Sequence, residues 1–135
     1  MRRGQRIGLA LSEDLKTFSR YEGGAVLEPD PQILLGYENA GKYGFGSAAF
    51  VDCRDFWVIK NKKDGLYYGY FAAAADIGRR APVGVIAVAV SDDLINWRDQ
   101  SIVFVPRQNG VIEAMDVFEF EEKWYLTVLC GNIYS

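Results

Sequence analysis

Glu113 is the residue of this sequence whose type and neighbours best suit chemistry. It stands three residues ahead of Asp116, and Ile112 and Ala114 flank it. An ionised carboxylate in apolar company is costly unless it is paired, so such a group tends to keep its proton. A carboxyl group that stays protonated near neutral pH can act as a general acid. The alternative is a loop carboxylate that reaches water, and position alone favours that alternative.

Catalysis in this chain would rest on carboxylates, with help from Arg, Tyr or Lys, because the 135 residues include no histidine. That absence removes the usual partner of a Ser or Cys nucleophile and the commonest metal ligand. The sequence therefore predicts no metal site and no cofactor. Cys53 and Cys130 are too few for a disulfide framework. Both lie in apolar, strand-like segments, so we expect two buried free thiols.

Composition restricts the class of protein. Half of the residues are hydrophobic and 14% are aromatic, which is enough for one domain with a packed core. The net charge is −3 and no basic block occurs, which argues against nucleic acid as a partner. The apolar run near the start ends at Leu11, too short for a secretory segment, and no run approaches a membrane span. We expect no membrane partner and, by default, a cytoplasmic location.

The segments that must position the candidate carboxylates are short and rich in β-branched and aromatic residues, and polar turns separate them. This pattern is typical of β-strands. Residues 110–129 are expected to form a hairpin that turns at 121–123. The other expected strands are Ile7–Leu11, Ala25–Pro29, Ala48–Ile59, Leu66–Ala75, Val83–Val90 and Ile102–Val105. No amphipathic helix of useful length is evident, so the prediction is an all-β chain.

The sequence also repeats itself. Ile7–Phe18 matches Ile86–Trp97, each with an apolar strand, a Ser, two acids, a Leu and an aromatic. The segment that begins at Asp55 aligns with the segment that begins at Asp116. Repeated four-stranded sheets of this kind are the blades of β-propellers. The predicted order is half a blade (7–29), a complete blade (48–106) and half of the next blade (112–129).

Three segments resemble one family of propellers. They are Cys53-Arg-Asp-Phe-Trp-Val58, Val85-Ile-Ala-Val-Ala-Val-Ser-Asp-Asp-Leu-Ile-Asn-Trp97 and Ile112-Glu-Ala-Met-Asp-Val-Phe118. They resemble, in order and spacing, the Arg-Asp-Pro, Ser-x-Asp-Leu-x-x-Trp and Glu-Cys-Pro-Asp motifs of the five-bladed β-propeller glycoside hydrolases of families 32, 43 and 68. That group includes invertases, levanases and arabinanases. The resemblance covers nearly the whole chain, which would supply about two of the five blades.

The resemblance implies roles for individual residues. Glu113 matches the general acid/base, and Asp55 matches the carboxylate that stabilises the transition state. Arg54, Trp57 and Asp116 are expected to bind the substrate. Two departures occur, since Phe56 replaces the motif proline and Ala114-Met115 replaces Cys-Pro. The family's nucleophile or general-base Asp belongs to an upstream motif that this sequence does not contain, although glycosidases need two carboxylates.

The expected partner is a carbohydrate, either a fructoside or an arabinoside, and the expected activity is glycoside hydrolysis. Alternatives are a module that binds a carbohydrate without cleaving it and a structural propeller module. In the binding module Trp57, Tyr67 and Tyr68 would line the pocket. The half blades would be completed by further copies of the chain, which predicts a homo-oligomer, or by the missing blades of a longer polypeptide.

Overall fold

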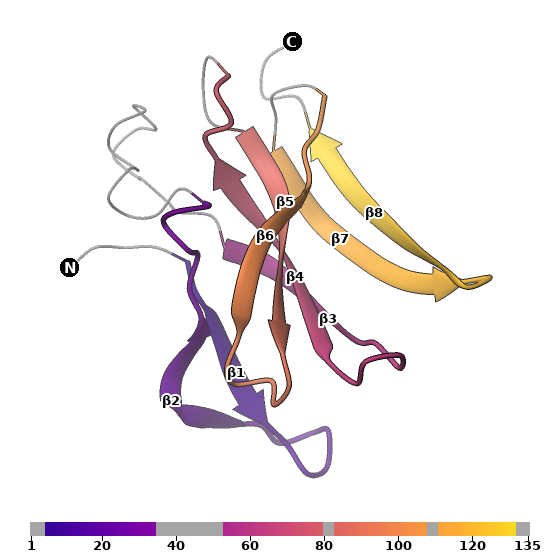
Figure 1. Ribbon diagram of the computed structural model, residues 1–135. Coiled ribbons are helices and arrows are strands. Elements are labelled where there is room, and N and C mark those ends of the chain that lie inside the picture. Colours follow the sequence, from indigo (N-terminus) through magenta and orange to yellow (C-terminus); the bar gives the residue numbers. More distant parts are fainter. Residues whose placement is uncertain (1–4, 35–52, 80–82, 108–110, 132–135) are drawn as a thin grey trace.

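The computed structural model of this chain describes residues 5–34, 53–79, 83–107 and 111–131 (Figure 1). These residues form strands and no helix, which confirms the all-β prediction. The strands are β1 (Ile7–Leu11), β2 (Ser19–Leu27), β3 (Cys53–Lys60), β4 (Tyr67–Ala75), β5 (Val83–Ser91), β6 (Arg98–Phe104), β7 (Val111–Phe120) and β8 (Lys123–Gly131). Accordingly, no described segment is a helix that is long and apolar enough to cross a membrane.

The strands form three antiparallel sheets of two, four and two strands, and within each sheet neighbours in sequence pair with each other. The sheets are β1–β2, β3–β4–β5–β6 and β7–β8. Figure 1 shows the four-stranded sheet between the two hairpins. The strands placed by the structure close into neither a barrel nor a ring, so the propeller architecture stays a prediction.

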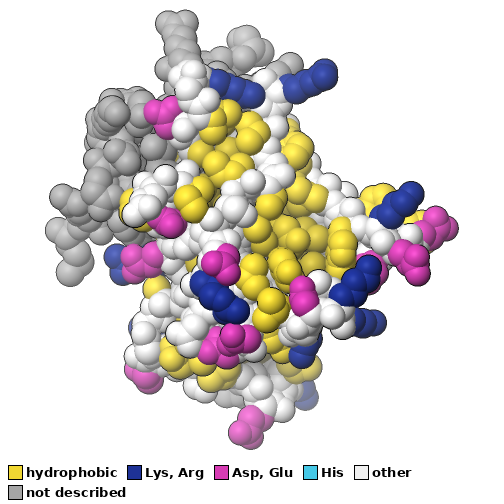
Figure 2. Space-filling view, viewed as in Figure 1, with side chains coloured by type: hydrophobic (Ala, Val, Ile, Leu, Met, Phe, Trp, Pro, Cys, Tyr) yellow, Lys and Arg dark blue, Asp and Glu magenta, His cyan; other side chains and the backbone are white. Residues whose placement is uncertain are grey.

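The core lies on both faces of the four-stranded sheet, because its central strands β4 and β5 are apolar on both sides. On one face, Phe71 and Val85 pack with Leu27 of β2. On the other face, Ile86 packs with Ile112 and Met115 of β7. Continuous apolar runs are typical of strands that are covered on both faces. Figure 2 shows hydrophobic side chains gathered along the junction between the four-stranded sheet and the β7–β8 hairpin.

The sequence repeat is also a structural repeat. The backbone N–H of Leu94 donates to Ser91 Oγ at 2.9 Å, and that of Leu15 donates to Ser12 Oγ at 2.9 Å. Both leucines have left-handed backbone angles, φ 67° at Leu94 and φ 61° at Leu15. Short polar side chains that bond to nearby backbone N–H groups favour such turns.

Trp97 packs on the four-stranded sheet over a glycine, Gly69. Its ring meets the edge of the Phe56 ring at a centroid distance of 5.0 Å. Its indole N–H donates to the Leu94 carbonyl at 3.1 Å. Between the two rings lies Gly69, where an added Cβ would collide with Phe56 and would lie 2.7 Å from Trp97. Glycine is therefore required there for close approach.

Three expectations about individual segments were wrong. β2 begins at Ser19 instead of Ala25, since Ser19 and Arg20 pair with Leu11 and Ala10. β6 begins at Arg98 instead of Ile102, since Arg98 pairs with Val90. Cys53 is buried as expected, but Cys130 is exposed because it lies near the end of β8, whose outer edge has no neighbouring strand among the residues placed. The first part of the strand expected at 48–59 falls on residues 48–52, which lie outside the described residues.

Candidate functional site

β3 and β7 contact each other, and each contains a bulge at the same place along its sheet. In β3 the register shifts between Arg54 and Trp57, and in β7 it shifts between Glu113 and Asp116. The residue after Arg54, Asp55, has a positive φ of 55°. The residue after Glu113, Ala114, has a positive φ of 49°. Bulges redirect side chains and often occur beside active sites.

The two bulges bring the motif carboxylates together. The backbone N–H of Ala114 donates to Asp55 Oδ2 at 3.0 Å, although the two residues are 59 positions apart in sequence. Arg54 Nη2 lies 3.0 Å from Glu113 Oε1 and forms a salt bridge with it. Arg54, Asp55 and Glu113 therefore form one cluster at the contact between the two strands.

Glu113 is thus neither an isolated carboxylate in apolar company nor a simple loop residue. Its side chain is 47% exposed, and that of Arg54 is 27% exposed. The guanidinium compensates the carboxylate charge and fixes the side chain in one position. The partial exposure leaves the cluster open to a ligand from the solvent.

Trp57 and Asp116 occupy corresponding positions just after the two bulges. The Trp57 indole N–H donates to the Val117 carbonyl at 3.0 Å, so its ring bridges β3 and β7. The residue is 42% exposed. Asp116 Oδ1 is buried and has no hydrogen-bond partner among the residues that the structure describes. An unsatisfied buried oxygen is unusual in a folded protein and calls for an explanation.

The expected alignment of Asp55 with Asp116 was wrong by two residues. Because the bulges coincide, Arg54 corresponds to Glu113 and Asp55 corresponds to Ala114. The error arises because the alignment matched two aspartates by residue type and not by the position of the bulges. Residues 61–66 connect β3 to β4, whereas only Glu121 and Glu122, both with positive φ, connect β7 to β8, so the spacing between the strands did not reveal the mismatch.

The expected tyrosines are not part of this cluster. Tyr67 and Tyr68 pair with Lys60 and Ile59 at the hairpin end of β3. From Arg54 to Ile59 the strand rises about 15 Å, so both tyrosines lie far from the bulge. The Tyr68 hydroxyl donates to Asp64 at 2.9 Å, and this bond raises the pKa of Tyr68.

Sequence reasoning missed Tyr70, which pairs with Trp57 across β3 and β4. It packs against the cluster of Ile86 and Met115. Burial, with the nearby Tyr68 as a second cause, raises the pKa of the Tyr70 hydroxyl. Alternation along β4 places Tyr70 on the same face as Tyr68, and this alternation was the available signal.

In the described parts of the chain, no group of three or more Cys, Asp or Glu side chains is arranged to hold a metal ion. At the bulges the Trp57 indole N–H and the Ala114 backbone N–H already donate within the protein. The carboxylate oxygens of Asp55 and Glu113 are acceptors, and such oxygens can accept from the hydroxyl groups of a polar ligand.

No protein-family model, no curated protein and no solved structure matches this chain. The resemblance to the propeller glycoside hydrolases therefore rests on the sequence motifs.

Proposed function

We propose that this chain is a carbohydrate-active protein of the five-bladed β-propeller glycoside hydrolase lineage. In this proposal, β3–β6 are one complete blade and the hairpins β1–β2 and β7–β8 are halves of the adjacent blades. The succession of two, four and two strands supports this assignment. So does the shared bulge in β3 and β7, which would be the innermost strands of neighbouring blades.

The observation that carries the proposal is the hydrogen bond between Ala114 N and Asp55 Oδ2, which joins two motifs that are distant in sequence. Glu113 acts as the general acid/base and Asp55 as the acceptor for sugar hydroxyls. Arg54 orients Glu113 through the 3.0 Å salt bridge. Trp57 is 42% exposed and offers an aromatic surface for a sugar ring, and Asp116 lies at the corresponding position of β7.

The second candidate is a site that binds a fructoside or arabinoside without cleaving it. The Arg54–Glu113 salt bridge favours this candidate, because a general acid must present a proton to the leaving group. Glycoside hydrolysis also needs a second carboxylate at a suitable separation. Asp55 is the nearest acid in the cluster, and it already accepts a hydrogen bond from the backbone.

The replacement Glu113→Gln separates the two candidates. Binding of levan and arabinan is measured by calorimetry, and hydrolysis of the same polymers by release of reducing sugar. For a hydrolase, we expect Glu113→Gln to lower kcat by about 100-fold or more while binding changes only slightly. The matched control is Glu119→Gln, an exposed acid on the same strand, which should change neither quantity.

Binding without hydrolysis by the unmodified chain would select the second candidate. Failure to bind either polymer would overturn the proposed function. Equal loss of turnover and binding in Glu113→Gln would contradict the acid/base role and would leave Glu113 as a binding residue.

A further inference from the structure

The four-stranded sheet is a template for how the two hairpins pair. The bulges align β7 with β3, so that β8 corresponds to β4. The repeated turn aligns β1 with β5, since Ser12 corresponds to Ser91. In the four-stranded sheet, β4 and β5 pair in antiparallel fashion along their whole lengths. The corresponding strands β8 and β1 each have only one neighbour among the described strands.

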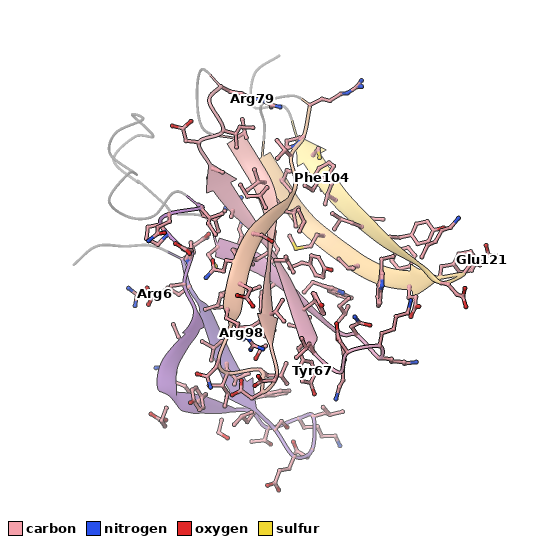
Figure 3. All side chains as sticks on the ribbon, in the orientation of Figure 1. Arg6, Tyr67, Arg79, Arg98, Phe104 and Glu121 are labelled. Atoms are coloured by element: carbon pink, nitrogen blue, oxygen red, sulfur yellow. The ribbon has the colours of Figure 1, made fainter. Side chains whose placement is uncertain are left out.

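β8 and β1 do not meet within one chain. The described parts of the two strands make no contact. Figure 3 shows Arg6 beside β1 on one side of the molecule and Glu121 at the tip of the β7–β8 hairpin on the other. The two strands therefore lie apart within one chain, which leaves their pairing to separate copies in a head-to-tail contact.

We propose that β8 of one copy pairs with β1 of a second copy in the register of β4 and β5. The composite sheet then has the order β7–β8–β1–β2, which reproduces the order β3–β4–β5–β6. The Cα partners follow from the template, in which Tyr68 pairs with Val90, Ala72 with Ile86 and Ala73 with Val85. Across the two copies they are Tyr125 with Leu11, Leu129 with Ile7, and Cys130 with Arg6.

Exposure of the open edges supports this pairing. Leu11 is 55% exposed and Leu129 is 61% exposed. Ala72, which corresponds to Leu129, is only 1% exposed because it packs with Ile86 of β5 and with Ile112 and Met115 of β7. Pairing would remove these apolar side chains from water and satisfy two rows of backbone groups, which is the usual reason that open edges recruit strands.

At one further position the changes in side-chain volume partly compensate each other. In the four-stranded sheet the large Trp97 requires Gly69 beneath it. In the composite sheet Phe18 takes the place of Trp97, and Leu126 takes the place of Gly69. A smaller aromatic ring then meets a larger aliphatic side chain, so the two changes in side-chain volume have opposite signs and partly offset each other. Phe18 is 59% exposed in the single chain and would be covered.

Each copy would contribute two blades, so a closed ring holds four from a dimer or six from a trimer. If the rotation does not close, the same contact continues as a fibre. This inference does not depend on the carbohydrate proposal, since it uses only the strands and their register.

The test is a directed disulfide between two different copies. One chain carries Arg6→Cys together with Cys130→Ser, and the other is the unmodified, isotope-labelled chain with its exposed Cys130. Residues directly opposite each other in antiparallel strands have Cα atoms about 4.5–5.5 Å apart, within the range that a disulfide spans. We expect mild oxidation to give a mixed dimer joined between position 6 and Cys130.

The matched control replaces Arg6→Cys by Ala10→Cys, which lies in β1, four residues further along the chain from position 6. At a rise of about 3.3 Å per residue, its thiol would lie about 13 Å from Cys130 along the strand. We expect at least about ten times less mixed dimer from this control. Equal yields from both chains would overturn the register. Sedimentation of the unmodified chain as a 15.1 kDa monomer at micromolar concentration would overturn the contact itself.

Discussion

The segments Ile86–Trp97 and Ile7–Phe18 share one local geometry and have different surroundings. In both, a serine oxygen accepts an N–H from the leucine three residues on, at 2.9 Å. In both, the aspartate two residues after that serine accepts backbone N–H groups further along, at 2.7–2.9 Å. Yet Ser91 is fully buried, whereas Ser12 is not.

The comparison shows that the geometry of the turn and the burial of the turn have different causes. The turn is specified locally, because its hydrogen bonds join residues within three positions of each other. Burial depends on whether neighbouring strands are present. Trp97 contacts Phe56 of β3, whereas Phe18 lies beside a two-stranded sheet and is 59% exposed. A two-stranded hairpin alone is at best marginally stable in water, so the packing of β1–β2 and β7–β8 on the central sheet must maintain both hairpins.

The largest difference between the two segments should appear when the aromatic side chain is removed. We expect Trp97→Ala to lower the free energy of unfolding by about 3 kcal/mol, since it removes the ring that packs on Phe56 and Gly69. Phe18→Ala should change it by no more than about 0.5 kcal/mol at concentrations too low for association. Urea unfolding of both variants measures the difference. Equal losses would mean that Phe18 is already covered within one chain.

A smaller effect is expected from the two aspartates. Backbone N–H groups, first that of Asn96 and then that of Ile95, hold the pKa of Asp93 far below its ordinary value of 3.8. Those of Thr17 and Lys16 lower the pKa of Asp14 to about 2. Because the folded pKa values are depressed, the ionised carboxylates stabilise the fold above pH 4, and this contribution is lost as the pH falls towards 2.

We therefore expect the stability of the chain to decrease between about pH 4 and pH 2, and the slope to become smaller in Asp93→Asn and in Asp14→Asn. Carboxyl chemical shifts followed by NMR give the two midpoints directly. The similar bonds at the two turns predict that both midpoints lie well below 3.8 despite the different burial of the two serines. A midpoint near 3.8 at Asp14 alone would show that the turn around Ser12 needs a covering strand to form.

Much of the fold could be predicted from local sequence patterns. β1 has the expected bounds of Ile7–Leu11, and β4 and β5 differ from their expected bounds by one residue. These strands are apolar and are bounded by turn residues, so their pattern is unambiguous. The repeat, in which Asp55 and Glu113 each open the first strand of a blade, also predicts that the two motifs lie in equivalent places, and a hydrogen bond from Ala114 to Asp55 joins them.

The bulges and the early part of β2 could not be predicted, because neither produces a hydrophobic pattern in the sequence. The bulges at Asp55 and Ala114 insert one residue into each strand, and their positive φ angles cannot be read from residue type. They determine which residues face each other, which is why Arg54 and not Asp55 corresponds to Glu113. The early part of β2 was missed because Arg20 and Glu22 are polar and Gly23-Gly24 is typical of a loop, yet pairing with β1 holds this segment extended.

The most direct test of the comparison is hydrogen exchange of the unmodified chain over a range of protein concentrations. β4 and β5 already have neighbours on both edges, so their amide protection should not depend on concentration. The protection of β1 and β8 should rise with concentration as each strand gains its second neighbour. Protection of β1 and β8 that stays the same from nanomolar to high micromolar concentration would contradict the account.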